Sequence, residues 1–155
     1  MLQGIDPVLN GALLRALDEM GHGDAVVVAD AHFTASKLAR KWLVDLPGLG
    51  SPRVLAAIRS VLVPDDYEPF QMALMAGPSE DLLEVQTELI TAAGFDHPRL
   101  VTDPDEYGAA PQVCLLPRQA FYDRAATAEL IVRTGEVRPY GNALFFKGVT
   151  PPYHQ

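Results

Sequence analysis

The chain has 155 residues, of which 48% are hydrophobic and 21% are charged, a composition typical of one globular domain over residues 1–155. Its formal net charge of −8 argues against binding to nucleic acid or to an anionic membrane surface, both of which attract clustered Lys and Arg. The single cysteine, Cys114, excludes an internal disulfide and a cysteine-based zinc site, and its apolar neighbours predict a buried, inert thiol. No apolar run is long enough to span a membrane, and the N-terminus lacks a signal-peptide pattern, so we expect a cytoplasmic protein.

Helices and strands alternate along most of the sequence. Asp6 and Pro7 are typical of a helix start, and apolar residues three and four apart continue to Met20, just before Gly21. Residues 25–29 (AVVVA) are apolar at every position, as in a central strand covered on both faces. The elements expected in chain order are a helix over 7–20, strands over 25–29 and 42–44, a helix from Ser51, a strand over 70–75, helices over 80–93 and 117–126, and strands over 130–133 and 143–146.

This alternation predicts an α/β fold with three layers, α/β/α, around a mixed and mostly parallel sheet. The last two strands follow each other without a helix between them, so part of the sheet is expected to be antiparallel. In the helix from Ser51, we expect Val54, Leu55, Ile58 and Leu62 to face the core.

A histidine between two glycines, Gly21-His22-Gly23, precedes the first strand. Such a histidine is often only a turn residue that caps the preceding helix. The glycines favour a functional interpretation, because they allow close approach of a ligand and leave the imidazole uncrowded. Histidine is also the side chain best suited to exchange a proton near neutral pH, so His22 is a candidate acid–base residue.

Asp30 follows the same strand at its carboxyl end, where ligands gather in α/β proteins. A carboxylate that braces the following loop is an equally good interpretation. His32 lies two residues further on and, with Asp30, could suggest a metal site. Two candidate ligands at that spacing are a weak signal, and proton transfer is the favoured role.

The C-terminal third carries further polar candidates. Arg118 and Tyr122 lie four residues apart on an expected helix, and therefore on one face of it. Tyr140, Gly141 and Asn142 come just before the last strand and offer hydroxyl and amide hydrogen bonds where the backbone can come close. Each of these groups also has an ordinary explanation, a solvated cation or a turn, and none is specific alone.

Taken together, the stretches GIDP, MGHGD, VADA, RTGE and YGN resemble the D-ribose pyranase and L-fucose mutarotase family in order and spacing. The resemblance implies interconversion of sugar forms with no metal or organic cofactor, with His22 as the proton donor. It implies that Asp30, Arg118 and the segment from Tyr140 through Gly141 to Asn142 contact the sugar, and Tyr122 holds a further ligand-lining position. Arginine at 118 and the YGN form resemble the fucose branch.

Mutarotation needs a positioned acid and base and no redox centre, so Tyr140 or Tyr122 would relay the second proton. His22 and Asp30 lie at opposite ends of the expected strand, up to about 26 Å apart at ~3.3 Å per residue. One chain therefore cannot bring both to one sugar unless the glycine turn folds back sharply. The resemblance implies a ring-like homo-oligomer, with a decamer as one candidate size, whose sites lie between subunits. A non-catalytic sugar-binding accessory of an uptake system and a metal-dependent enzyme using His22, Asp30 and His32 remain alternatives.

Overall fold

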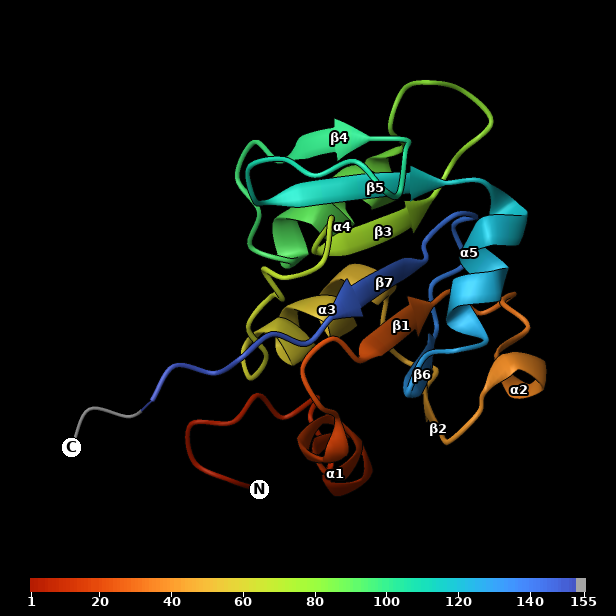
Figure 1. The fold of residues 1–155 in the computed structure, drawn as a ribbon. Coiled ribbons are helices and arrows are strands. Elements are labelled where there is room, and N and C mark those ends of the chain that lie inside the picture. Colours follow the sequence, from red (N-terminus) through yellow and green to blue (C-terminus); the bar gives the residue numbers. More distant parts are fainter. Residues whose placement is uncertain (153–155) are drawn as a thin grey trace.

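The computed structural model describes residues 1–152, which form one seven-stranded sheet and five helices (Figure 1). The elements in chain order are α1 (Gly11–Glu19), β1 (Ala25–Ala29), α2 (Ala35–Leu38), β2 (Trp42–Leu46), α3 (Ser51–Arg59), β3 (Met72–Met75), α4 (Glu84–Ala92), β4 (Arg99–Val101), β5 (Gln112–Leu116), α5 (Arg118–Ala125), β6 (Leu130–Thr134) and β7 (Ala143–Phe146).

The strands lie in the order β2-β6-β1-β7-β3-β5-β4. Six of these described strands run parallel to one another, and β7 runs antiparallel to both of its neighbours, β1 and β3. The expected mixed, mostly parallel sheet is therefore confirmed. β7 is also the strand that joins the β2-β6-β1 half of the sheet to the β3-β5-β4 half.

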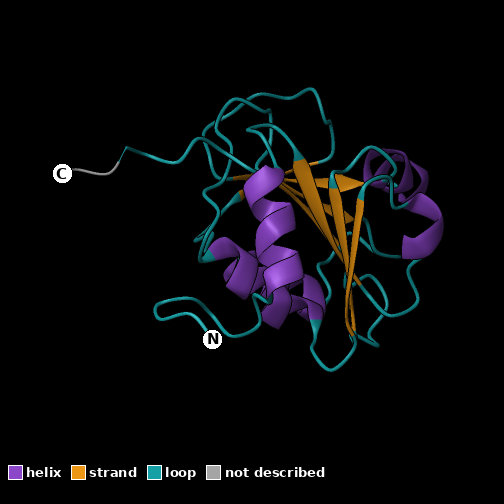
Figure 2. Ribbon diagram, turned by 90° about the horizontal axis from the view of Figure 1, so that it is seen from below, coloured by secondary structure: helices purple, strands orange, loops and turns teal. Residues whose placement is uncertain are grey.

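Helices cover both faces of the sheet and complete the expected three layers (Figure 2). Helices α1, α3 and α4 pack on one face, and α2 and α5 pack on the other. Side chains alternate along β1, because Val26 and Val28 join the first core whereas Val27 and Ala29 join the second. All five residues of this strand are buried, as its uniform apolar sequence predicts.

The helix starts differ most from the expectation. Helix α1 begins at Gly11 rather than at Pro7, because Asn10 caps it by accepting a hydrogen bond from the Leu13 N–H (2.9 Å). Asp6 is instead bound by Arg53, which holds the pKa of that carboxyl below its usual value. Helix α4 begins at Glu84, four residues after the expected start.

The helix from Ser51 has its four predicted inward residues buried, and the predicted strand over 70–75 begins at Met72. The short elements α2, β4 and β5 were not predicted.

Cys114 is buried, as predicted, and burial raises the pKa of its thiol to about 11. Within residues 1–152, every helix is too short or too polar to cross a membrane.

Candidate functional site

The carboxyl ends of β1, β3 and β5 and the amino end of β7 meet at one edge of the sheet, because β7 runs the opposite way. A pocket of about 230 Å³ opens there. Its lining residues are Asp30, His32, Phe33, Met75, Arg118, Tyr122, Pro139, Tyr140 and Asn142. Five of the residues predicted to contact the sugar thus line a single pocket, although they come from three separate segments of the chain.

A reciprocal pair of hydrogen bonds joins Asp30 to Asn142 at the buried side of this pocket. The Asn142 side-chain amide donates to Asp30 Oδ2, and the Asp30 backbone N–H donates to Asn142 Oδ1, each at 2.8 Å. Asp30 Oδ1 also accepts the backbone N–H of His32 at 3.0 Å. Asp30 therefore braces its own loop and lines the pocket at the same time. Each carboxylate oxygen has a second lone pair left for a ligand.

Arg118 and Tyr122 lie on one face of α5, as their spacing predicts. The central carbon of the Arg118 guanidinium lies 5.4 Å from the centre of the Tyr122 ring. One guanidinium N–H donates to the Tyr122 hydroxyl at 3.4 Å. Phe33 also packs against this tyrosine, with ring centres 5.3 Å apart. The aromatic contacts hold Tyr122 in place, while Arg118 remains exposed and free to meet a polar ligand.

The segment before β7 adopts an unusual backbone conformation. Tyr140 has a φ of +64°, in the left-handed region that few residues with a side chain occupy. A Cβ on Gly141 would lie 2.6 Å from Glu136 Cγ, so only glycine fits there. Gly141 does not line the pocket itself; its missing side chain lets the backbone pack against Glu136 between Tyr140 and Asn142, which do line it.

An ion-pair network that sequence analysis missed supports this segment. Glu136, only 5% exposed, accepts hydrogen bonds from the Arg138 guanidinium at 2.9 and 3.0 Å, and Arg138 also binds both carboxylate oxygens of Glu88 on α4. These bonds with Arg138 lower the pKa of both carboxyl groups. The sequence signal was the RTGE motif itself, whose glutamate holds the Tyr140 segment rather than a ligand.

His22 lies at the opposite edge of the sheet, before the amino end of β1, and takes no part in the pocket. The Asp24 carboxylate closes the turn around His22 by accepting the Gly21 N–H at 2.7 Å. Gly23 in this turn has a φ of +81°, in the left-handed region that favours glycine. The imidazole is exposed. Of the predicted site residues, the structure thus leaves only His22 and Gly141 outside the pocket lining, and it separates His22 from Asp30 and His32, the other proposed metal ligands.

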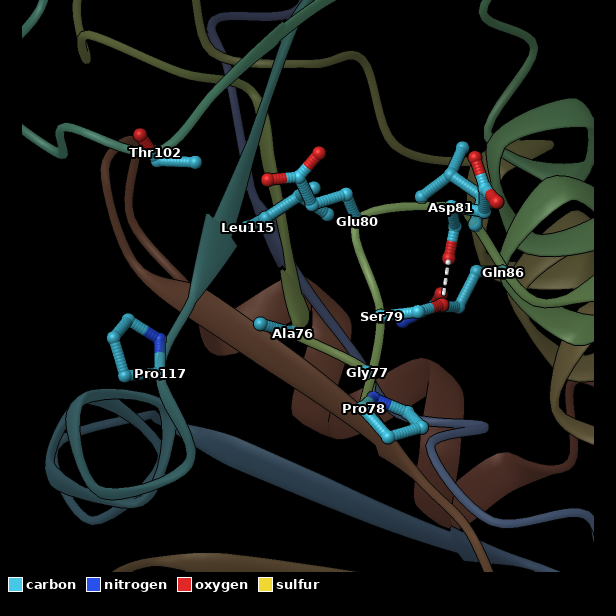
Figure 3. Close-up of a pocket in the computed structure, with 11 residues that line it drawn as sticks. Ala76, Gly77, Pro78, Ser79, Glu80, Asp81, Gln86, Thr102, Leu115 and Pro117 are labelled. Carbon is cyan, nitrogen blue, oxygen red and sulfur yellow. Dashed lines mark hydrogen bonds between the residues drawn. The ribbon is translucent and has the colours of Figure 1, made fainter.

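A larger cavity of about 570 Å³ lies beside the pocket, under the loop between β3 and α4 (Figure 3). Its lining residues are Ala76, Gly77, Pro78, Ser79, Glu80, Asp81, Leu82, Gln86, Thr102, Leu115 and Pro117. The Gln86 amide donates to the Met75 carbonyl (2.8 Å) and accepts the Leu83 N–H (2.9 Å), so it braces the start of α4 against the end of β3. Despite its size, this cavity has a more apolar lining than the Asp30 pocket.

Fold and pocket together define an α/β protein that presents carboxylate, amide, guanidinium and phenol groups to a small polar ligand at the carboxyl edge of its sheet. A family model, the RbsD / FucU transport protein family, matches residues 3–150. The chain belongs to this family, and the resemblance drawn from its motifs is confirmed.

Relatives of similar length accompany this match. The chain is 38% identical over 151 residues to a protein of Actinobacillus pleuropneumoniae serotype 5b (strain L20) named L-fucose mutarotase, covering 97% of this chain and 99% of that protein. A fucose mutarotase from Streptococcus pneumoniae, solved in complex with L-fucose, is 30% identical with a TM-score of 0.80, over 97% of this chain and 100% of that one. Bacillus subtilis RbsD, solved with D-ribose, is 20% identical with a TM-score of 0.68, over 97% and 99%, and shares the fold.

Proposed function

We propose that this chain is a single-domain sugar mutarotase, an isomerase that interconverts the ring forms of fucose or a related monosaccharide by acid–base ring opening and closure. The proposal rests on the pocket lined by Asp30, Arg118, Asn142 and the tyrosines Tyr122 and Tyr140. It is supported by the similarity of the chain, over its length, to proteins named L-fucose mutarotase. Its volume of about 230 Å³ lies below the ~300–1,000 Å³ common for drug-sized ligands. A pocket of this size suits one monosaccharide.

The chemistry requires two proton transfers and their reversal. The anomeric hydroxyl loses a proton and the ring oxygen gains one as the C–O bond of the hemiacetal breaks; closure on the other face of the aldehyde reverses both transfers. Asp30 and Asn142 bind sugar hydroxyls through their remaining hydrogen-bonding capacity, and Arg118 binds another. Tyr140 or Tyr122 relays one proton. The reaction transfers protons and no electrons, so it needs no redox cofactor, and positioned acid–base groups carry it in this proposal.

His22 is the proton donor to the ring oxygen in this proposal, and it comes from a neighbouring copy of the chain. Its place at the far edge of the sheet from Asp30 supports this arrangement, since a monosaccharide is far smaller than β1 is long. A ring-like homo-oligomer, a decamer among the candidate sizes, would juxtapose the two edges. We place this assembly in the cytoplasm, as the sequence analysis expects.

Saturation-transfer NMR of anomer exchange tests the function directly, with fucose, ribose and galactose as substrates. We expect faster exchange with wild type and loss of catalysed exchange in His22→Gln. The matched control is His97→Gln, because His97 is also an exposed histidine outside the regular elements but belongs neither to the Asp30 pocket nor to the turn before β1. A wild-type protein that binds these sugars without speeding their exchange would instead be a binding accessory.

A further inference from the structure

The ring of His22 has an aromatic neighbour from a distant part of the sequence. The ring centre of Tyr67 lies 5.7 Å away, with the two ring planes inclined at 52°. Tyr67 is 70% exposed, which is high for a large aromatic side chain held in a defined place. Any ligand that reaches the imidazole of His22 therefore also comes within reach of this phenol.

The backbone at the end of β7 is hydrogen-bonded both to the turn that carries His22 and to the loop that carries Tyr67. The Lys147 carbonyl accepts the Gly23 N–H at 2.7 Å, and the carbonyl of the preceding residue, Phe146, accepts the Asp65 N–H at 3.1 Å. The backbone of Gly148 also lies against the second loop, since a Cβ there would lie 2.3 Å from the Pro64 carbonyl oxygen. The turn of His22 and the loop of Tyr67 are thus positioned by a common support.

Asp65 connects the two loops more closely. It is only 1% exposed, and its Oδ1 accepts the Tyr67 N–H at 3.1 Å. Its Oδ2 has no hydrogen-bond partner among the described residues and would lie 3.8 Å from a Cβ on Gly23. A buried carboxylate oxygen without a partner is uncommon and calls for a specific reason. Oδ1 thus fixes the Tyr67 backbone, while Oδ2 faces the turn that carries His22.

We propose that Tyr67 is a sugar-contacting residue of the His22 half of the shared site, and that Asp65 is the residue that positions it. This inference rests on the proposed mutarotase function. Tyrosine offers an apolar ring face for the C–H groups of a sugar and a hydroxyl for its oxygens. The Asp30 pocket of one copy supplies hydrogen bonds to the sugar, and the neighbouring copy adds the phenol together with the imidazole.

Kinetics of anomer exchange and titration calorimetry with fucose test the proposal. Tyr67→Ala should raise KM and Kd by about five- to tenfold while changing kcat less, and Tyr67→Phe should retain most of the affinity because it keeps the ring. The matched control is Tyr107→Ala, since Tyr107 is 71% exposed on the connection from β4 to β5 and should leave both constants unchanged. Asp65→Ala should raise KM as Tyr67→Ala does, and Asp65→Asn should restore it, because the asparagine oxygen can still accept the Tyr67 N–H.

The oligomeric state of each variant is measured by native mass spectrometry. Wild-type KM and Kd for Tyr67→Ala in an intact assembly would overturn the inference, as would a loss of affinity seen only when the assembly dissociates. Should Asp65→Ala fail to fold, the Tyr67 variants decide. If wild type does not speed exchange at all, the proposed function fails, and the Tyr67 contact is judged on Kd alone.

Discussion

Two inactive variants, His22→Ala and Asp30→Ala, should restore each other's activity when their subunits assemble together. The reason is that β1 separates the two residues, which stand eight positions apart on either side of a five-residue strand that spans roughly 13 Å at ~3.3 Å per step. A site that takes His22 from one copy and Asp30 from the next is intact only when the first subunit carries Asp30→Ala and the second carries His22→Ala.

The expected size of the effect follows from random assembly. In an equal mixture each position is filled by either variant with about even odds, so about a quarter of the sites contain both native residues. The two variants are unfolded, mixed, refolded and assayed by saturation-transfer NMR, and mixed assemblies are verified by native mass spectrometry. Exchange should recover to about a quarter of the wild-type rate per subunit.

The control mixture pairs Asp30→Ala with Asn142→Ala. Asp30 and Asn142 are hydrogen-bonded to each other within one chain, so both belong to the same half of the site. Each subunit in this mixture lacks one of the two residues, and no neighbouring subunit can supply it. Exchange should therefore stay at background. If the mixture of His22→Ala and Asp30→Ala also stays at background despite proven co-assembly, the site is built within one chain and the argument from β1 is wrong.

Other expected outcomes concern single variants and conditions. Arg118→His should change the ratio of kcat/KM between fucose and ribose by about tenfold, and equal losses for every sugar would instead indicate a catalytic or structural arginine. Exchange should persist in excess EDTA; a loss that one metal restores would contradict this. Phe121→Ala should lower the free energy of unfolding by about 3–5 kcal/mol in urea titrations, because this ring is fully buried. Arg138→Gln should lower the free energy of unfolding above pH 4.5, the ordinary pKa of the Glu136 carboxyl. The loss of stability relative to wild type should vanish as pH falls through the lowered pKa of that carboxyl in the folded protein. A loss of stability that does not change with pH would contradict the ion-pair explanation.

The central part of the fold was predictable because local sequence determines it. The run 25–29 is apolar at every position and forms a strand buried on both faces. Arg118 and Tyr122 share a helix face because their spacing matches the helical period. The predicted first helix was too long because Pro7 is a good helix start by itself, yet the Asn10 side chain offers a better cap three residues later.

Long-range pairing could not be predicted in the same way. The position of β7 between β1 and β3 depends on partners more than sixty residues away in sequence, and β4 has only three residues, two of them exposed, so it lacks a periodic pattern. Asp65 and Tyr67 were missed for a related reason. Their loop contains no motif, and its significance lies in its contact with the turn of His22, which only tertiary structure reveals.

The place of β7 in the sheet has a consequence for how the chain folds during synthesis. The three strands on each side of it can pair among themselves, but the two halves are joined only when residues 143–146 have left the ribosome, after the other six strands. Tyr140 and Asn142, which line the pocket just before β7, are placed there when β7 pairs. A nascent chain that ends before Ala143 would therefore expose two unpaired central edges, which are the kind of surface that chaperones shield.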